Sequence, residues 1–248
     1  MKGMKALNFG SLNYDYVYTV DHMVREGETL SSEKMETFLG GKGFNQSVAL
    51  SRAGIDVKHA GAVGEEGEGF LAFCRENGID TSYIRTLPGK SGHTIIQIDR
   101  NAQNCILLYG GANQSITKEY VDEVLAHFEK GDILLLQNEV NMLDYIIDSA
   151  YEKGLMIILN PSPYNSALDR CDFNKISMFL LNEIEGAQVT GEENTDKTVS
   201  YTHLDVYKRQ RERCWRMISR RTSGWAATRW TTCTKKGTCR LRWIKRPS

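Results

Sequence analysis

The 248-residue sequence lacks the features that would place it in a membrane or outside the cell. It has no run of about 18 apolar residues, so no membrane-spanning helix is expected. Its start, MKGMKALNFGSLNYDYV, lacks the apolar core of a signal peptide, which makes the cytoplasm the expected compartment. None of its six cysteines forms a C-x-x-C pair, so neither a zinc site nor a disulfide framework is indicated. Cys74, Cys105 and Cys171 are expected to be small buried or neutral residues.

Tryptophan is also missing from the first 196 residues, and all four tryptophans come after Lys197. The charge divides at the same place. Residues 197–248 carry 15 lysines and arginines against 2 acidic residues, whereas residues 1–196 carry 16 against 29. The net charge of zero therefore conceals two segments of opposite charge.

The segment VSYTHLDVYKRQ, residues 199–210, lies at this break and resembles a translated sequencing adapter. The residues after it show no apolar period of a helix or a strand, and their excess of Arg, Trp, Cys and Thr is typical of DNA read out of frame. We therefore expect residues 1–197 to form the folded domain and residues 198–248 to be an artefactual or disordered basic tail. The alternative is a basic arm that binds nucleic acid through its tryptophans. The adapter-like segment argues against that alternative, and no nucleic-acid partner is expected.

Residues 1–196 alternate between strand and helix patterns. Continuous apolar runs such as DILLLQNEV predict strands buried on both faces, and amphipathic stretches such as TKEYVDEVLAHFEKG predict helices. This alternation predicts an α/β fold, a doubly wound and mostly parallel sheet with helices on both faces, incomplete at its C-terminal side. Segments near 13–20, 33–39 and 91–110 lack intervening helices and are expected to form a separate small β-sheet that acts as a lid.

The stretch FLGGKGFNQSVALSRAG, residues 38–54, places three glycines and a lysine just before a helix expected over residues 45–53. Glycines leave backbone N–H groups accessible, and a helix start adds unpaired donors and the positive end of the helix dipole. This combination suits an anion or a hydroxyl-rich ligand. An ordinary glycine-rich turn before a helix explains the stretch equally well at this point.

Polar side chains follow several of the expected strands, namely Asn13, Asp15, Gln137, Asn138, Glu139, Asn160, Asn182 and Glu185. In open α/β sheets, ligands gather at the carboxyl ends of strands, and carboxylates and amides can bond to sugar hydroxyls. Each residue alone is explained by a cap or a turn, but their number favours a ligand site. His59 and His93 have no partner at metal spacing and are expected to be structural.

Seven segments in this order and spacing resemble the PfkB family of carbohydrate kinases, and within it the ribokinases: GSLNYDYV, GGKGFNQSVALSRAG, VGEEGEG, YGGANQSIT, LLLQNEV, LNPSP and LLNEIEGAQVTG. The resemblance runs from about Met4 to Glu193. It implies a ribokinase-like fold and ATP-dependent phosphorylation of the primary hydroxyl of a pentose, with ribose as the expected sugar. The alternatives are a relative acting on another sugar or a nucleoside, and a non-catalytic sugar-binding module.

The resemblance also implies roles for individual residues. Sugar contacts are expected from Asn13, Asp15, Gly41, Lys42, Asn45 and Glu139. Asn182 corresponds to a nucleotide-phosphate contact and Glu185 to a residue associated with Mg²⁺ and phosphate. ATP and Mg²⁺ are the expected cofactors, with a monovalent cation (K⁺) in the complete enzyme.

The sequence departs from the family at its second signature, a Gly-Ala-Gly-Asp-like segment whose aspartate deprotonates the attacking hydroxyl. That segment is absent, so no catalytic residue is assigned, and the chain as printed is expected to be inactive. Asp15, Lys42, Asn45 and Glu139 are expected to converge on one sugar site. The exposed face of the small sheet is a candidate surface for a homodimer.

Overall fold

The computed structural model describes residues 4–190 together with residues 225–226 and 244–245. The chain forms two compact units, Met1–Gly191 and Glu192–Ser248. The elements of the first unit are, in chain order, β1 (Ala6–Phe9), β2 (Asn13–Thr19), β3 (Lys34–Gly40), α1 (Lys42–Arg52), β4 (Val57–Val63), α2 (Glu68–Glu76), β5 (Asp80–Thr86), β6 (Gly92–Ile98), β7 (Asn104–Tyr109), η1 (Gly111–Gln114), α3 (Lys118–Leu125), β8 (Ile133–Gln137), α4 (Leu143–Glu152), β9 (Met156–Asn160), η2 (Ser166–Arg170), η3 (Phe173–Lys175), β10 (Met178–Phe179) and α5 (Glu183–Thr190).

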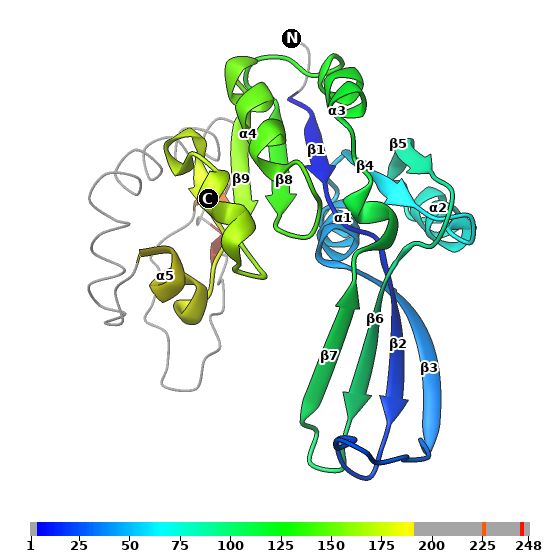
Figure 1. Cartoon of the computed structure of the whole chain (residues 1–248). Helices are drawn as coiled ribbons and strands as arrows, with labels where there is room; N and C mark the ends of the chain where they lie inside the picture. The colour runs from blue at the N-terminus through cyan, green and yellow to red at the C-terminus, as the bar shows by residue number, and fades with distance from the viewer. Residues whose placement is uncertain (1–3, 191–224, 227–243, 246–248) are drawn as a thin grey trace. The chain divides into compact units, whose positions relative to one another are not determined.

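Six strands form one large sheet in the order β10-β9-β8-β1-β4-β5, and every neighbouring pair is parallel (Figure 1). From β1 the chain builds β4 and β5 on one side, and it then crosses over to build β8, β9 and β10 on the other. The direction of winding therefore reverses between β1 and β8. This arrangement confirms the predicted doubly wound α/β fold and places the switch point, where such sheets bind ligands, between these two strands.

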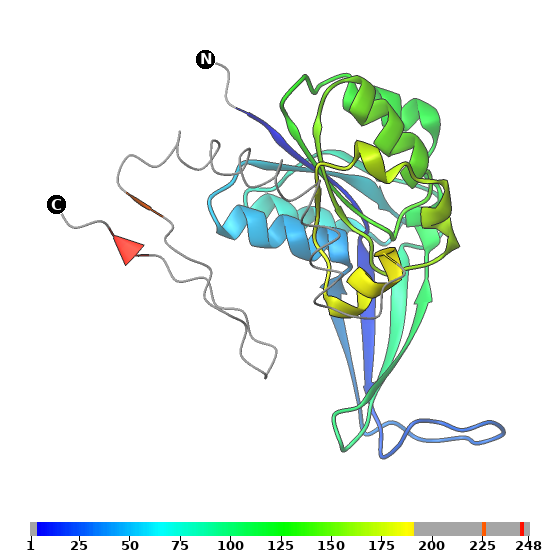
Figure 2. The same cartoon turned by 90° about the vertical axis from the view of Figure 1, so that its left-hand side faces the viewer.

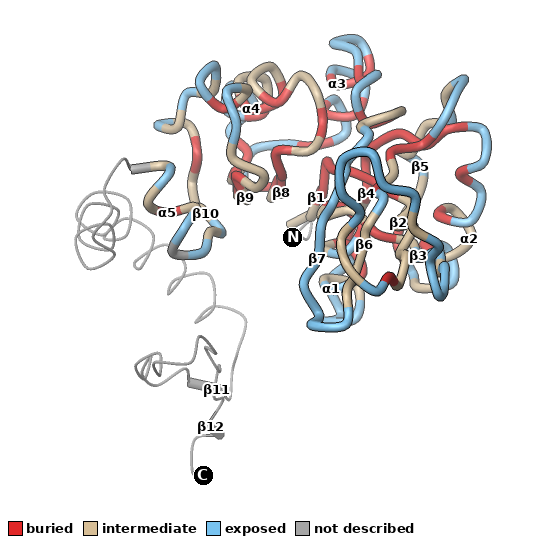
Figure 3. Tube along the Cα trace, turned by 60° about the horizontal axis from the view of Figure 1, so that its bottom comes forward, coloured by how far each residue is buried: buried red, intermediate tan, exposed pale blue. Residues whose placement is uncertain are grey.

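Helices cover both faces of the large sheet (Figure 2). On one face Phe44 and Val48 of α1 pack in a cluster with Phe70 of α2, whereas Val121 of α3 and Ile146 of α4 belong to the larger cluster on the other face. Buried strands lie between these helix layers (Figure 3). Successive strand side chains alternate between the two faces, so each one packs against the helices on its own side of the sheet. A polar side chain in a strand therefore needs a partner on the helix that covers that face.

The four remaining strands of the unit form a second sheet in the order β3-β2-β6-β7. β2 pairs antiparallel with β3 and parallel with β6, and β6 pairs antiparallel with β7. This sheet extends away from the large one (Figure 1), as expected for the predicted small β-sheet. Strand β7 is exposed along its whole length.

Three details differ from the sequence expectations. Helix α1 begins at Lys42 rather than at Asn45, because distant segments satisfy its first backbone amides. Strand β5 was not predicted, since this edge strand is mostly half-buried and carries no continuous apolar run. Cys105 lies exposed on β7, whereas Cys74 is buried and Cys171 is half-buried.

In the second unit the described residues are two short strands, β11 (Trp225–Ala226) and β12 (Ile244–Lys245), which pair antiparallel. The rest of the predicted basic tail at 198–248 lies outside the described residues, so its interpretation stays a prediction. None of the helices in the described part of the chain has the length and apolar character needed to cross a bilayer.

Candidate functional site

A group of polar side chains lies at the switch point between β1 and β8. Ser11 follows the end of β1 and Glu139 follows the end of β8. Lys42 is the first residue of α1, the helix that connects β3 of the small sheet to β4 of the large sheet. The parallel pairing of β1 and β8 brings the first two residues to the same sheet edge, although 128 positions separate them in sequence.

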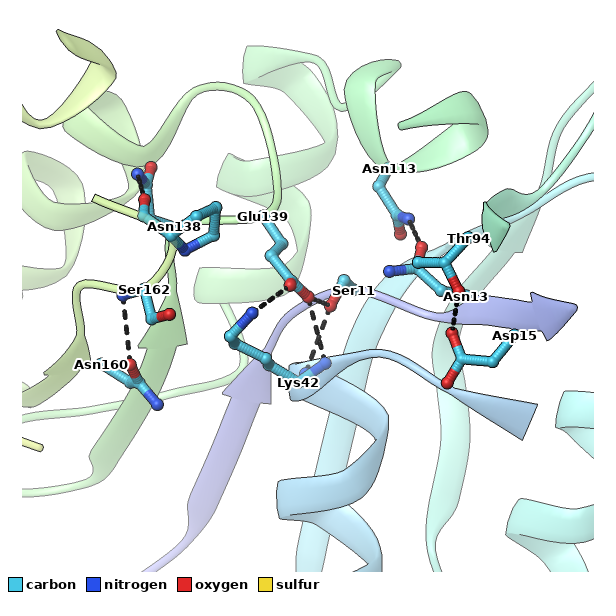
Figure 4. A network of polar contacts seen from close by, with 12 residues as sticks. Ser11, Asn13, Asp15, Lys42, Thr94, Asn113, Asn138, Glu139, Asn160 and Ser162 are labelled. Carbon is cyan, nitrogen blue, oxygen red and sulfur yellow. Dashed lines mark hydrogen bonds and ion pairs between the residues drawn. The ribbon is translucent and has the colours of Figure 1, made fainter. Parts of the chain in front are cut away.

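Glu139 is the centre of this group (Figure 4). Its Oε1 accepts the Lys42 ammonium at 2.6 Å, and its Oε2 accepts the Lys42 backbone N–H at 3.0 Å. The Ser11 hydroxyl also donates to Oε2. The Glu139 side chain is only 7% exposed, whereas that of Lys42 is 36% exposed. The nearly buried carboxylate is therefore held by three donors, and the more accessible ammonium group is available to a ligand.

The first amides of α1 are all used within the chain. In addition to the Lys42 amide, Gly43 N–H donates to Ser11 Oγ at 3.2 Å and Phe44 N–H donates to the Ser11 carbonyl at 2.9 Å. The Glu139 carboxylate thus occupies the anion position at the start of α1, and of the two kinds of ligand that the glycine loop suits, the hydroxyl-rich ligand stays a prediction.

Glycine is required where α1 approaches β1. A Cβ on Gly43 would lie 2.4 Å from the Ser11 backbone nitrogen, a contact that backbone atoms cannot relieve. Gly41, the residue before the helix, has φ of 93°, in the left-handed region that favours glycine. The two glycines thus permit the close approach that lets Lys42 and Ser11 share one carboxylate.

Asp15, on β2 of the small sheet, is the second carboxylate near the group. Its Oδ1 accepts the Thr94 hydroxyl of β6 at 2.6 Å, and a Cβ on Gly40 would lie 2.0 Å from its Oδ2. Burial raises the pKa of Asp15, and the Glu139 carboxylate acts in the same direction, while the Thr94 hydrogen bond and Lys42 oppose the increase. The pKa of Asp15 therefore depends on the charges of both Lys42 and Glu139.

The other predicted sugar contacts differ in their placement. Asn13 is buried, and its Oδ1 accepts the Asn113 side-chain amide at 2.7 Å (Figure 4). Asn113 in turn accepts the Leu12 backbone N–H at 3.1 Å, which anchors the start of β2. Asn45 lies exposed in the first turn of α1, and no hydrogen bond of its side chain is found within the described residues. The structure thus joins Lys42 and Glu139 directly, places Asp15 beside them, and leaves Asn45 at the surface.

Asn182 and Glu185 lie at the start of α5, after the edge strand β10. Glu185 Oε2 accepts the Asn182 N–H at 3.0 Å, and Asn182 Oδ1 accepts the Glu185 N–H at 2.9 Å. This reciprocal pattern is that of a helix capping box. In the large sheet β8 and β9 separate β10 from β1, so both residues lie along the same sheet edge as Glu139 but farther from its centre.

Three polar residues of the site were not singled out from the sequence: Ser11, Thr94 and Asn113. Ser11 and Asn113 stand inside quoted motifs, GSLNYDYV and YGGANQSIT, but nothing local distinguishes them from turn residues. The β2–β6 register sets Asp15 opposite Thr94, and only strand pairing could identify that partner.

The arrangement is suited to a ligand rich in hydroxyl groups. A carboxylate accepts hydroxyl donors, and an ammonium group donates to hydroxyl oxygens and offsets the repulsion between two carboxylates. No group of three or more His, Cys, Asp or Glu side chains placed to hold a metal ion occurs among the described residues.

Comparison with known proteins gives consistent matches. A family model described as pfkB family carbohydrate kinase matches residues 5–209. The chain is 32% identical over 204 residues to a ribokinase of Haemophilus influenzae, covering 80% of the chain and 66% of that protein. It is 30% identical over 187 residues to a deoxyribokinase of Salmonella typhi, covering 73% of the chain and 61% of that protein. The chain thus spans about two thirds of the length of these relatives.

A structural comparison agrees. The crystal structure of a ribokinase from Cryptococcus neoformans in complex with ADP matches with a TM-score of 0.70 at 27% identity, covering 83% of this chain and 70% of that one.

Proposed function

Because the chain belongs to the pfkB family of carbohydrate kinases, we propose that its described part is the sugar-binding portion of an ATP-dependent kinase whose substrate is ribose. The observation that supports this most is the group at the switch point, in which Glu139 is held by Lys42 and Ser11. A buried carboxylate held by fixed donors can orient an ammonium group toward hydroxyl oxygens without losing its own partners. Asp15 adds an acceptor from the small sheet.

The proposed reaction is phosphoryl transfer to the primary hydroxyl of the sugar. The hydroxyl oxygen forms a bond to the γ-phosphorus of ATP, the bond from that phosphorus to the bridging oxygen breaks, and the hydroxyl proton passes to a base. No residue after Lys197 stands in the family's general-base motif. The chain as printed is therefore proposed to bind sugar without sustained turnover, and the residues described here position the hydroxyl-bearing substrate.

ATP is the proposed phosphoryl donor, and the cytoplasm, where ATP is abundant, is the proposed compartment. Asn182 and Glu185 are proposed to face its phosphates and the accompanying Mg²⁺, and K⁺ is proposed for the complete enzyme. Within the described residues Glu185 is engaged in the capping box with Asn182.

A homodimer through the small sheet is also proposed. Four apolar residues in sequence along β7 are between 43% and 67% exposed: Ile106, Leu107, Leu108 and Tyr109. Because successive strand side chains alternate between faces, Ile106 and Leu108 lie on one face of the small sheet and Leu107 and Tyr109 on the other. An exposed apolar face of this kind is expected to be covered by a partner, and a second copy presents the same face.

Binding of ribose, measured by isothermal titration calorimetry, tests the proposed function. Asp15→Asn should weaken ribose binding about tenfold or more, since a charged acceptor is lost. The matched control is Glu36→Gln, which changes a half-exposed carboxylate on the neighbouring strand β3 and should leave binding unchanged. Failure of the unmodified chain to bind ribose would contradict the proposal.

A kinase assay separates the catalytic alternatives. ADP release that depends on ribose should be absent for the printed chain and present once the reading frame after Lys197 is restored. Absence from the restored protein as well would favour a non-catalytic sugar-binding module.

Deoxyribose is the second candidate substrate, because a deoxyribokinase is among the relatives. Titration with 2-deoxyribose beside ribose distinguishes the two. Tighter binding of 2-deoxyribose would reassign the substrate without changing the proposed class of reaction.

A further inference from the structure

A chain of buried polar side chains lies beneath the site, between α1 and the large sheet. Asn8 of β1, Ser47 of α1, His59 of β4 and Gln137 of β8 are all fully buried. Asn8 and His59 are register partners on neighbouring strands, so they share the sheet face that α1 covers. On that face apolar residues would pack without the desolvation cost that these four incur.

The hydrogen bonds that link these buried side chains all donate in the same direction, from Gln137 toward the Gly10 carbonyl. Gln137 Nε2 donates to Asn8 Oδ1 at 2.9 Å, and Asn8 Nδ2 donates to Ser47 Oγ at 2.8 Å. His59 Nε2 lies 3.2 Å from the Gly10 carbonyl, which can only accept, so Nε2 carries the proton. His59 Nδ1 is therefore the acceptor for the Ser47 hydroxyl, at 2.7 Å. One histidine tautomer therefore satisfies the side chains of Asn8, Ser47 and His59. Within the described residues Gln137 Oε1 is buried without a hydrogen-bond partner.

Asn8 makes one further bond, from its Nδ2 to the Gly43 carbonyl at 2.6 Å. The network thus reaches three segments that carry the site. Gly10 precedes Ser11, Gly43 follows Lys42, and Gln137 comes shortly before Glu139. Ser11 and Lys42 are therefore each adjacent to a residue that the network fixes, and Glu139 is two positions from one.

The packing shows how little freedom these segments have. A Cβ on Gly10 would lie 2.1 Å from Gln137 Oε1 and 2.7 Å from Gly43 Cα. The ends of β1 and β8 and the start of α1 therefore meet at Gly10. Small shifts there would move Ser11, Lys42 and Glu139 relative to one another.

We infer that Asn8, Ser47 and His59 are positioning residues, whose buried network sets the geometry of the Lys42–Glu139–Ser11 group. The role in sugar binding rests on the proposed function, whereas the positioning of the group does not. Buried hydrogen-bond networks of this kind favour one arrangement of the segments that they join. Within the described residues no hydrogen bond is found between Asn8, Ser47 or His59 and a proposed sugar-binding side chain, and the network acts through the backbone at Gly10 and Gly43.

Amide hydrogen exchange, followed by NMR on the full chain, tests this inference without a ligand. The reporters are the Lys42 and Gly43 amides, which donate to Glu139 Oε2 and Ser11 Oγ. Ser47→Ala removes the link between Asn8 and His59. It should speed exchange of both reporters about tenfold, while amides of Leu136 and Ile157 in the buried strands change little.

Ser51→Ala is the matched control, because Ser51 lies one turn later on α1 and donates to the Asn77 carbonyl outside the network. It should leave the two reporters unchanged. Asn8→Leu removes the centre of the network and should have a larger effect than Ser47→Ala. If Asn8→Leu does not fold, the comparison of Ser47→Ala with Ser51→Ala alone decides whether the network positions the group.

Ribose titration of the same variants adds the functional readout. Ser47→Ala should weaken ribose binding about tenfold while Ser51→Ala does not. Equal exchange changes in the two serine variants, or an even increase across the sheet after Ser47→Ala, would overturn the inference. Absence of ribose binding in the unmodified chain would contradict the proposed function instead, and the exchange result would still decide the positioning role.

Discussion

Burial of one partner determines how much the Lys42–Glu139 ion pair contributes to the free energy of unfolding. Lys42→Met leaves the nearly buried Glu139 carboxylate without its cation, so the free energy of unfolding should fall by about 1–3 kcal/mol. Urea denaturation measures the change. Lys34→Met is the matched control, because Lys34 and its partner Glu36 are 62% and 41% exposed. It should cost less than about 1 kcal/mol. Equal losses would mean that Glu139 does not depend on Lys42.

His59 makes stability depend on pH. Burial lowers the pKa of His59 to about 4, and only the neutral ring accepts the Ser47 hydroxyl. In the unfolded chain a histidine titrates near 6.5, so between these values the unfolded state binds the extra proton. The stability due to neutral His59 is therefore complete above about pH 6.5. It is lost as the pH falls toward 4, by about 3 kcal/mol in total.

Unfolding by urea at several pH values measures this dependence. His59→Asn should flatten the curve between pH 6.5 and 4 relative to the unmodified chain. Ser51→Ala, which changes no titratable group, should leave the slope as it is. An unchanged slope in the His59 variant would show that other groups cause the dependence.

At the scale of elements, the start of α1 is limited by its contact with β1. Gly43→Ala places a methyl group against the Ser11 backbone nitrogen, so it should lower the free energy of unfolding by more than about 2 kcal/mol. Gly69 holds the same place in α2, where the nearest atom to an added Cβ would be the Tyr14 hydroxyl oxygen, at 3.3 Å. Gly69→Ala should change stability by less than about 1 kcal/mol, because alanine favours the helix. Thermal unfolding of both variants checks the contrast, and equal effects would contradict the tight approach of α1 to β1.

Most of the elements could be predicted from the sequence, because burial on one or both faces imposes a period on the residues. Strand β8 reads as a continuous apolar run since helices cover both its faces. Strand β5 lacked such a signal at the sheet edge. The first turn of α1 was missed because its stabilising partners, Ser11 and Glu139, are remote in sequence.

At the scale of the whole molecule, the small sheet is the proposed contact between two copies. Ile106 and Leu107 are adjacent on β7, so they point to opposite faces of the sheet. Sedimentation velocity of the unmodified chain should show a dimer. Only one of the two variants Ile106→Glu and Leu107→Glu should dissociate it, and that variant identifies the buried face. A monomeric unmodified chain would contradict the proposed dimer.

The interpretation of residues 198–248 also concerns the whole chain, and it stays a prediction. Sequencing the DNA across codons 199–210 checks it. A continuous frame without adapter sequence would overturn the interpretation of the tail and would reopen the basic-arm alternative.

The sequence by itself determined the alternation of strands and helices, the separate small sheet and the motifs that contain Asp15, Lys42 and Glu139. These are local properties, because side-chain periodicity and glycine flexibility are set by near neighbours. Only the tertiary structure decided that Glu139, 97 positions away from Lys42, accepts the first backbone amide of α1, which the sequence alone leaves without a partner. It also decided that Thr94 fixes Asp15 and that Asn8 joins three segments. These pairings depend on strand order and register, which bring residues distant in sequence to one sheet edge.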